Sequence, residues 1–164
     1  MTVDLDERER ERARLRAQYL EGPGTRPAST AHGLHHMALM CSDVERTIRF
    51  YQELLGFPLV EVFENRDYKG STHLFFDIGH DNTLAFFDFP GLGLGPYAEV
   101  LGGLHHVAIS VDARSWEAAR TRLVEAGIAV HVESGISLYF SDPDGVRLEL
   151  IAEDLGSLYG TPLH

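Results

Sequence analysis

The 164-residue sequence predicts an α+β fold built from two βαβββ modules, and three observations carry this prediction. The segment Gly33–Leu39 (GLHHMAL) is nearly repeated at Gly103–Ile109 (GLHHVAI). Each copy is followed by an acidic turn residue and then by apolar residues at helical spacing. Three short runs of strand-forming residues follow in both halves. A unit of about fifty residues cannot bury enough apolar surface alone, so the two modules are expected to pair into one domain.

The first 30 residues are expected to form a charged arm and linker, and residues 31–164 the main domain. Residues 4–21 alternate acidic and basic side chains and have only a thin apolar stripe, a pattern typical of a solvated helix. The Gly- and Pro-rich connector Gly22–Pro27 ends that helix. The arm contains equal numbers of acidic and basic residues, so the formal charge of −11 belongs to the rest of the chain.

The first module is predicted to span residues 33–90. Its opening strand leads to Asp43 and then to a helix with an apolar stripe formed by Val44, Ile48, Tyr51, Leu54 and Leu55. Gly56 is expected to end this helix in a left-handed conformation. The three strands that follow are predicted at 59–63, 72–78 and 83–89.

The second module is predicted to span residues 103–153 in the same order. Its helix follows Asp112, ends at Gly127 and has an apolar stripe formed by Trp116, Ala119, Leu123 and Val124. Its later strands are predicted at 129–133, 136–141 and 146–152. The Gly-rich segment Pro90–Pro96 is interpreted as a crossover between modules, because it lacks the Gly-Lys-Ser/Thr sequence of a phosphate-binding loop.

The composition excludes several classes of function. An acidic chain with a pI near 5.1 repels phosphate backbones, so nucleic acid is not expected as a partner. The single cysteine, Cys41, allows neither an internal disulfide nor a thiolate zinc site, which favours a reducing, cytoplasmic location. No apolar run approaches the roughly 18 residues of a membrane span, and the charged N-terminus is not a signal peptide. Nine histidines point instead to metal or acid/base chemistry.

Strand alternation selects three candidate metal ligands. His36 and His106 each share a strand face with a small alanine two residues on, which leaves open space, whereas His35 and His105 are expected on the packed faces. On the last strand the same rule turns Glu149 away from its apolar neighbours. Two imidazoles and one carboxylate form the facial set that binds a divalent metal with open positions. The alternative is that both histidines are structural residues repeated with the module.

The repeated strand openings and the segment Leu138–Leu150 (LYFSDPDGVRLEL) resemble the vicinal oxygen chelate superfamily, which includes glyoxalases, bleomycin resistance proteins and extradiol dioxygenases. The resemblance covers roughly Gly33 to Glu153, and the Asp-Pro-Asp-Gly turn is its most specific mark. It implies paired modules that form a curved, incompletely closed mixed sheet around a metal cup. The metal ligands of the family fall on His36, His106 and Glu149.

Departures from the family pattern narrow the expected activity. Four-ligand members, such as glyoxalase I, resemble one another in having an extra Glu or Gln on the last strand of the first module. Phe86 aligns with that position here, where it is expected to form an apolar substrate-binding wall, and Asp88 is a weaker candidate for the fourth ligand. Bleomycin-binding members lack the metal set. Fosfomycin-type enzymes share three ligands but handle a small phosphonate, which suits this acidic chain poorly.

The resemblance therefore favours an extradiol-type dioxygenase with Fe(II), or with Mn(II), acting with O2 on a small aromatic or enolic substrate; Zn(II), Ni(II) or Mn(II) would serve the non-redox alternative. Tyr139 has the spacing from Glu149 of the tyrosine that assists such enzymes, and His131 is near the place of their acid/base histidine. A non-redox lyase or isomerase of the glyoxalase type and a non-catalytic ligand-binding resistance protein are the alternatives. The superfamily is known for modules that pair within one chain and for modules that pair across two chains, and the sequence does not choose between them. A homodimer is expected, because the outer strands of such modules are sheet edges that need covering.

Overall fold

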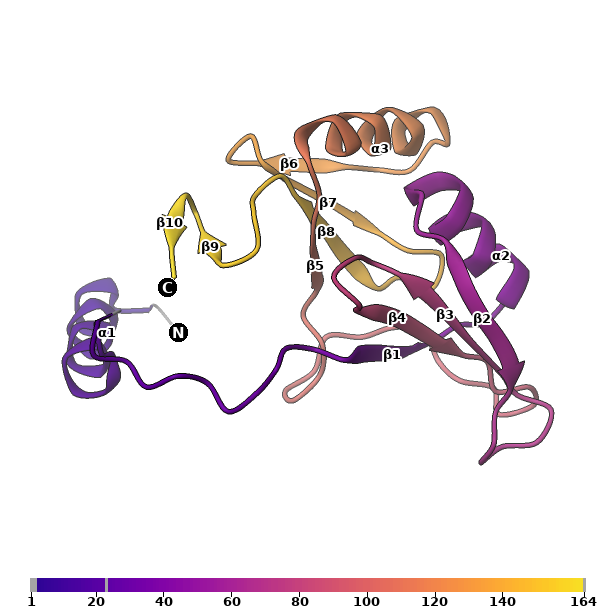
Figure 1. The fold of residues 1–164 in the computed structure, drawn as a ribbon, viewed down its shortest axis with the longest axis horizontal. Coiled ribbons are helices and arrows are strands. Elements are labelled where there is room, and N and C mark those ends of the chain that lie inside the picture. The colour runs from indigo at the N-terminus through magenta and orange to yellow at the C-terminus, as the bar shows by residue number, and fades with distance from the viewer. Residues whose placement is uncertain (1–2, 23, 164) are drawn as a thin grey trace.

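The computed structural model describes residues 3–22 and 24–163 (Figure 1). The predicted N-terminal helix is present as α1 (Leu5–Tyr19). It begins where the side chain of Asp4 accepts hydrogen bonds from the backbone N–H groups of Asp6 and Glu7. None of its described side chains is buried, and the helix stands apart from the two sheets (Figure 1). The arm is thus a solvated helix, as its charge pattern predicts.

The first module forms one four-stranded mixed sheet. Its elements are β1 (His36–Met40), α2 (Val44–Ile48), η1 (Arg49–Leu55), β2 (Leu59–Glu64), β3 (Thr72–Asp77) and β4 (Thr83–Phe87). The strand order is β1-β4-β3-β2, with β1 parallel to β4 and the other pairs antiparallel. The order β-α-β-β-β confirms the sequence prediction.

The helical segment of the first module changes form along its length. The side chain of Asp43 caps α2, as predicted. From Arg49 onward the chain continues as the π-helix η1 instead of the predicted α-helix, and a π-helix has a wider turn. The segment ends at Gly56, whose φ of 85° is the left-handed conformation predicted there. Through η1 three apolar side chains are buried: Phe50, Tyr51 and Leu55.

The second module repeats this topology. It contains β5 (Val107–Ser110), α3 (Ala113–Glu125), β6 (His131–Glu133), β7 (Ser137–Ser141) and β8 (Arg147–Ile151). The sheet order is β5-β8-β7-β6, again with only the first pair parallel. Asp112 caps α3, and Gly127 after it has a φ of 73°. The two sheets are separate and neither closes into a barrel, which fits the incompletely closed α+β fold.

A C-terminal hairpin follows that the sequence did not predict. The strands β9 (Ser157–Leu158) and β10 (Thr161–Pro162) pair antiparallel across a two-residue turn, Tyr159-Gly160. Both turn residues have positive φ values, 50° and 74°, which match a tight hairpin turn. The carboxylate of Glu153 accepts hydrogen bonds from both backbone N–H groups of the turn and so holds the hairpin in place.

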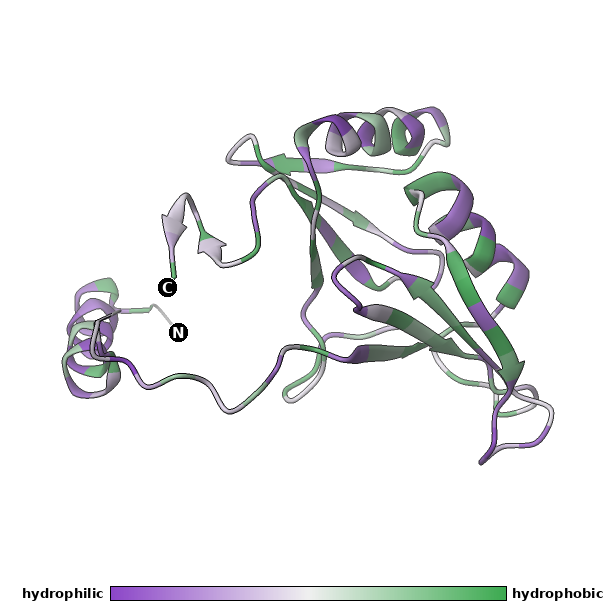
Figure 2. Ribbon diagram, viewed as in Figure 1, coloured by the Kyte–Doolittle hydropathy of each residue, from purple (hydrophilic) through white to green (hydrophobic). Residues whose placement is uncertain are grey.

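One apolar core joins the two modules. Figure 2 shows apolar residues along the strands and at intervals along α2 and α3. The ring of Phe50 lies 6.2 Å from that of Phe140 in the second module, while Tyr51 lies 4.8 Å from Phe86 in its own sheet. Arg122 of α3 donates a 2.6 Å hydrogen bond to the carbonyl of Leu54 in the last turn of η1. Among the described helices, none is long and apolar enough to span a membrane.

The Asp-Pro-Asp-Gly turn before β8 connects the modules. One oxygen of Asp142 accepts hydrogen bonds from the backbone of Asp144 and Val146 at 2.9 and 2.8 Å. The other accepts a 3.0 Å bond from the hydroxyl of Tyr51 in η1. Asp144 in turn accepts a 3.0 Å bond from the backbone N–H of Ser42, after β1. The turn therefore fixes the start of β8 against the first module.

Burial changes the pKa values of the two residues, Asp142 and Tyr51, that join the turn to η1. Desolvation is the main cause that raises the pKa of Asp142, although hydrogen bonds from Val146 and Tyr51 act in the opposite direction. The pKa of Tyr51 is raised well above its usual range by burial and then by the charge of Asp142. The tyrosine therefore stays protonated and serves as the hydrogen-bond donor of the pair.

Candidate functional site

The second module brings three predicted site residues together. Glu149 lies on β8 between two core leucines, so its side chain points to the opposite face of the sheet, where it is only 5% exposed. The Nε2 atom of His106 lies 3.1 Å from the Oε2 atom of Glu149. Tyr139 is the direct neighbour of Glu149 across β7 and β8, and its ring stands edge-on to that of His106 at 5.8 Å. A carboxylate, an imidazole and a phenol thus converge.

The environment of Tyr139 keeps its phenol protonated. Desolvation, followed by a hydrogen bond to Glu149 and the negative charges of Glu149 and Glu133, raises its pKa to about 12. At neutral pH the hydroxyl is therefore a hydrogen-bond donor, not a base. Tyr159, at the tip of the C-terminal hairpin, is near enough to contribute to the same shift.

His131 lies on the same face as these residues. It stands directly opposite Tyr139 in the β6–β7 pairing, on the edge strand of the sheet, and its side chain is exposed. Residues that face each other across two strands project from the same side of a sheet. The imidazole of His131 therefore lies at the rim of the face that carries Glu149.

His105 does not lie where strand alternation placed it. It was expected on the packed face, yet it is exposed, because β5 begins only at Val107 and the alternation does not extend back to it. Its Nδ1 atom lies 2.7 Å from the Nδ1 atom of His106, and its Nε2 atom lies 3.1 Å from an amino group of Arg147. His105 therefore orients His106, and the doubled histidine in the sequence is the signal that could have shown this.

The first module repeats the paired histidines on an open face. The Nδ1 atoms of His35 and His36 lie 2.8 Å apart, as in the second module. His36 is exposed on β1, and its ring stands edge-on to that of Phe75 at 6.1 Å. The repeat thus includes the geometry of the dihistidine as well as its sequence.

The structure does not gather the three predicted metal ligands within one chain. Two of them, His106 and Glu149, are together in the second module, and His36 is in the first. Among residues 3–22 and 24–163, no group of three or more His, Cys, Asp or Glu side chains is close enough to hold a metal ion. The strands that carry the histidines, β1 and β5, are both outer strands of their sheets.

The structure corrects the place expected for Phe86. Ala108 pairs with Glu149 in the second module, and its counterpart Ala38 pairs with Ala85 in the first. Ala85 is therefore the structural counterpart of Glu149. Phe86 points to the other side of the sheet and is fully buried in the core, because a shift of one residue reverses the face of a strand residue.

Asp88, the other candidate for a fourth ligand, is hydrogen-bonded to the backbone. Its carboxylate accepts a hydrogen bond from the backbone N–H of Thr72 at the start of β3. With alanine at position 85, the first module offers no carboxylate at the place equivalent to Glu149.

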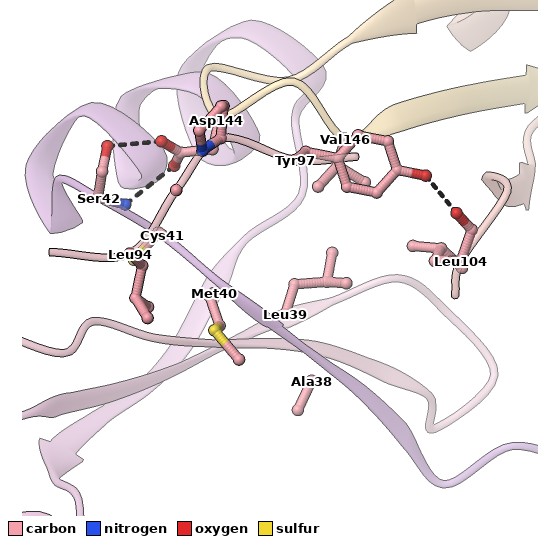
Figure 3. Close-up of a pocket in the computed structure, with 12 residues that line it drawn as sticks. Ala38, Leu39, Met40, Cys41, Ser42, Leu94, Tyr97, Leu104, Asp144 and Val146 are labelled. Atoms are coloured by element: carbon pink, nitrogen blue, oxygen red, sulfur yellow. Dashed lines mark hydrogen bonds between the residues drawn. The ribbon is translucent and has the colours of Figure 1, made fainter. Parts of the chain in front are cut away.

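A pocket of about 410 Å³ runs beside β1 (Figure 3). Its lining includes Ala38 and Met40, which share the strand face of His36, and part of the crossover. Its polar groups are already paired: Ser42 with Asp144, and the hydroxyl of Tyr97 with the carbonyl of Leu104. Burial raises the pKa of Cys41 to about 11, so its thiol is protonated. The pocket is mainly apolar and follows an open strand edge.

Comparison with known proteins places these features in a family. The family model described as "Glyoxalase/Bleomycin resistance protein/Dioxygenase superfamily" matches residues 33–150. "Putative ring-cleaving dioxygenase MhqA" of Bacillus subtilis is 27% identical over 80% of this chain, which covers 44% of MhqA. The chain therefore spans less than half the length of that relative. A lactoylglutathione lyase of Salmonella typhimurium is 34% identical over 75% of this chain and 95% of its own length.

Solved structures give the same fold. The fosfomycin resistance protein FosX from Mesorhizobium loti is 25% identical, with a TM-score of 0.60 over 77% of this chain and 95% of FosX. A FosX variant from Listeria monocytogenes, solved with Mn(II) and a dihydroxypropylphosphonic acid, is 20% identical with a TM-score of 0.60. It covers 77% of this chain and 96% of its own. These relatives are named for different activities, so the family alone does not assign one to this chain.

Proposed function

We propose that this chain, which belongs to the Glyoxalase/Bleomycin resistance protein/Dioxygenase superfamily, is a metal-dependent enzyme that oxygenates a small aromatic or enolic substrate. The observation that supports it most is the convergence of His106, Glu149 and Tyr139 on one face of the second sheet. The donor set of imidazole and carboxylate suits Fe(II) or Mn(II). When bound, such a metal supplies Lewis acidity and an open position for O2.

The donor atoms in the second module fit a metal ion. The carboxylate of Glu149 is buried, and the Nε2 atom of His106 is its close neighbour. His105 and Arg147 form a hydrogen-bonded outer layer that fixes the orientation of His106. Such outer partners are a regular part of metal sites, because they hold the ligand ring in place. These are two of the three ligands of a facial set, which still needs a second histidine.

The second histidine would be His36 of another copy of the chain. β1 and β5 are open edges, and placing β1 of one copy beside β5 of the other would cover both. That pairing would bring His36 next to His106 and Glu149. The apolar pocket beside β1 is a suitable place for the added strand. We therefore favour a homodimer with two shared sites, each metal held by His36 of one copy and by His106 and Glu149 of the other.

Two further side chains have roles in this proposal. Tyr139 keeps its proton and would donate a hydrogen bond to a substrate oxygen beside Glu149. His131 at the exposed rim would exchange protons with solvent during the reaction, since an imidazole can both accept and donate a proton. Phe86 has no such role, because it lies in the core.

A second candidate is a non-redox lyase or isomerase of the glyoxalase type. The lactoylglutathione lyase relative, at 34% identity, favours it. Against it stands Ala85, which leaves the first module without a carboxylate at the position equivalent to Glu149. A site with three protein ligands retains more open positions, which suits joint binding of substrate and O2. The third possibility, ligand binding without catalysis, predicts that ligand affinity is independent of metal.

The test is anaerobic reconstitution of the full chain with Fe(II), followed by elemental analysis and an oxygen electrode. We expect about one metal per chain, and O2 uptake on a panel of catechols, hydroquinones and gentisate-like acids. Glu149→Ala should lose both metal and uptake, whereas the matched variant Glu117→Ala, on the exposed face of α3, should retain both. Stoichiometric iron with no uptake on any of these substrates would sink the oxygenase proposal and favour the lyase.

A further inference from the structure

The face of the first sheet that carries His36 is a platform of aromatic rings. The pairing register places four rings from three neighbouring strands on this face, which we name the aromatic platform: Phe63, His73, Phe75 and Phe87. His73 lies at its centre, 3.7 Å from the ring of Phe87 in a stacked arrangement and 4.2 Å from that of Phe75. Phe63 stands edge-on to His73 at 5.1 Å. The platform adjoins His36 through Phe75.

One atom of the platform is unusual. In the part of the chain that the structure describes, the Nε2 atom of His73 is the only buried side-chain nitrogen or oxygen with no hydrogen-bond partner. Buried polar atoms are nearly always paired, because an unpaired one loses its bonds to water without replacement. A phenylalanine at this position would fill the same space among three phenyl rings at no such cost. The Nε2 atom therefore has a hydrogen-bonding capacity that the described part of the chain leaves unused and that a ligand could satisfy.

We infer that the aromatic platform binds the ring of the substrate and that the Nε2 atom of His73 hydrogen-bonds a hydroxyl group on that ring. The inference rests on the proposed function and names its substrate class: a phenol whose ring lies over the first sheet. Flat aromatic faces stack favourably on one another, and an imidazole edge recognises a hydroxyl group. A residue of β3 thus becomes a specificity determinant.

The structure offers a way for such a ring to reach His73. Phe63 covers the imidazole from the edge strand β2, and the residue is 46% exposed. An exposed side chain on an edge strand has few packed neighbours to hold it. A ligand that displaces Phe63 would take its place beside His73 while Phe75 and Phe87 keep their positions.

The second module differs in a way that explains why the aromatic platform would bind the ring of the substrate and not its metal-binding oxygen. The matching face of the second sheet carries Tyr139, Glu149, His131 and Arg147, which are all polar or charged. A phenolic substrate held between the two faces would direct its metal-binding oxygen to the polar face and its ring to the aromatic platform. The hydroxyl bound by His73 is then a second, remote one.

The test uses binding to the metal-free full chain, so it does not depend on turnover. Two probes of nearly equal shape differ in the hydroxyl: 4-methylphenol and 4-fluorotoluene. We expect the wild-type chain to bind the phenol more tightly, and His73→Phe to weaken phenol binding about 5- to 10-fold while 4-fluorotoluene binding changes less than about twofold. Phe75→Leu should weaken both probes, since it removes ring contacts common to both. His32→Phe, at an exposed position of the linker, is the matched control and should change neither.

A second measurement needs no variant. Nitrogen chemical shifts of the imidazole of His73, followed by NMR while 4-methylphenol is added to the wild-type chain, should move for Nε2 and stay nearly constant with 4-fluorotoluene. Equal phenol affinity of wild type and His73→Phe, or an Nε2 shift that does not respond to the phenol, would overturn the inference. Because no metal or O2 is present, a failed oxygenase assay with positive phenol binding refutes only the proposed reaction, and the reverse result refutes only the aromatic platform.

Discussion

The two modules share a backbone and differ in the faces they present. Both have the same strand order, an aspartate cap, a glycine stop and a pair of hydrogen-bonded histidines. The face of the first sheet is aromatic, whereas the face of the second is polar and charged. Duplication has therefore preserved the residues that define the fold and has allowed the side chains on the two faces to diverge. One half is suited to holding a ring and the other to holding a metal.

The comparison is sharpest at a single pair of positions. Ala85 and Glu149 occupy equivalent places on the last strands of the two sheets, each beside an alanine of the first strand. Glutamate gives the second module an anionic ligand, and alanine gives the first module room. In the proposed shared site the first module contributes one ligand, His36, and the second contributes His106 and Glu149. A substitution in one module should therefore be complemented by a copy of the chain that is substituted only in the other module.

The largest expected effect comes from mixing two inactive variants. His36→Ala and Glu149→Ala should each abolish metal-dependent activity by removing a ligand. When the two chains are refolded together, half of the dimers are mixed and each of these has one intact site, so activity should return to about a quarter of wild type. The measurement is metal content and O2 uptake of the mixture.

The control for this experiment is a pair of variants on the same side of the site. His106→Ala mixed with Glu149→Ala leaves every site broken, so no activity should return in that mixture. Recovery in neither mixture would show that the three residues do not form sites shared between copies in the proposed way.

The next effect tests the corrected face of β4. Phe86→Ala should lower the free energy of unfolding by about 3–5 kcal/mol, because it leaves a cavity in the core beside Tyr51. Urea denaturation measures the change, and Phe87→Ala, on the aromatic platform, is the comparison. Because Phe87 is partly exposed, Phe87→Ala should lower the free energy of unfolding less than Phe86→Ala does, and it should weaken phenol binding more. A larger loss of stability for Phe87 than for Phe86 would contradict the assignment of faces.

Much of the scaffold was predictable because its signals are local. The helix caps at Asp43 and Asp112 and the glycines that end the helices depend on neighbouring residues only. Alternation also placed Glu149 correctly, since apolar residues on both sides of it fix the face of β8. A repeated motif then extended these local signals to the whole topology.

The incorrect prediction for Phe86 arose where the sequences of the two repeats do not align residue for residue. The sequence alignment of the two repeats made Phe86 the counterpart of Glu149. The turns before β4 and β8 differ in shape, however: His80 and Asp81 have positive φ values, and the second turn contains a proline. The alignment was therefore wrong by one residue. His73 was not identified because its burial depends on rings from two other strands, and sequence periodicity does not show which strands are neighbours.

The same turns predict a difference in stability between the modules. Asp142→Ala removes three accepted hydrogen bonds at a buried site and should cost about 3 kcal/mol. In the first module the corresponding turn is exposed, so Asp81→Asn, which keeps a residue that tolerates positive φ, should change stability by less than about 0.5 kcal/mol. Urea denaturation compares them. Equal costs would show that the Asp-Pro-Asp-Gly turn is not the connection between modules.

The smallest effect is on the pH dependence of stability. Burial raises the pKa of Asp142, so the folded chain binds this proton more tightly than the unfolded chain. The contribution is therefore favourable at low pH, and the free energy of unfolding falls as pH rises from the ordinary aspartate value of 3.8 through the raised pKa. Asp142→Asn should remove that fall, and Asp81→Asn should not.

Tyr51 supplies the decisive comparison for this prediction. Its hydroxyl lowers the pKa of Asp142 and so partly opposes the effect of burial. Tyr51→Phe removes the bond, so the pKa of Asp142 should rise further and the fall in stability should extend to higher pH. Thermal unfolding between about pH 3.5 and 7 measures this window. A fall that moves to lower pH in Tyr51→Phe would mean that the charge of Asp144 or other groups, and not burial of Asp142, controls the titration.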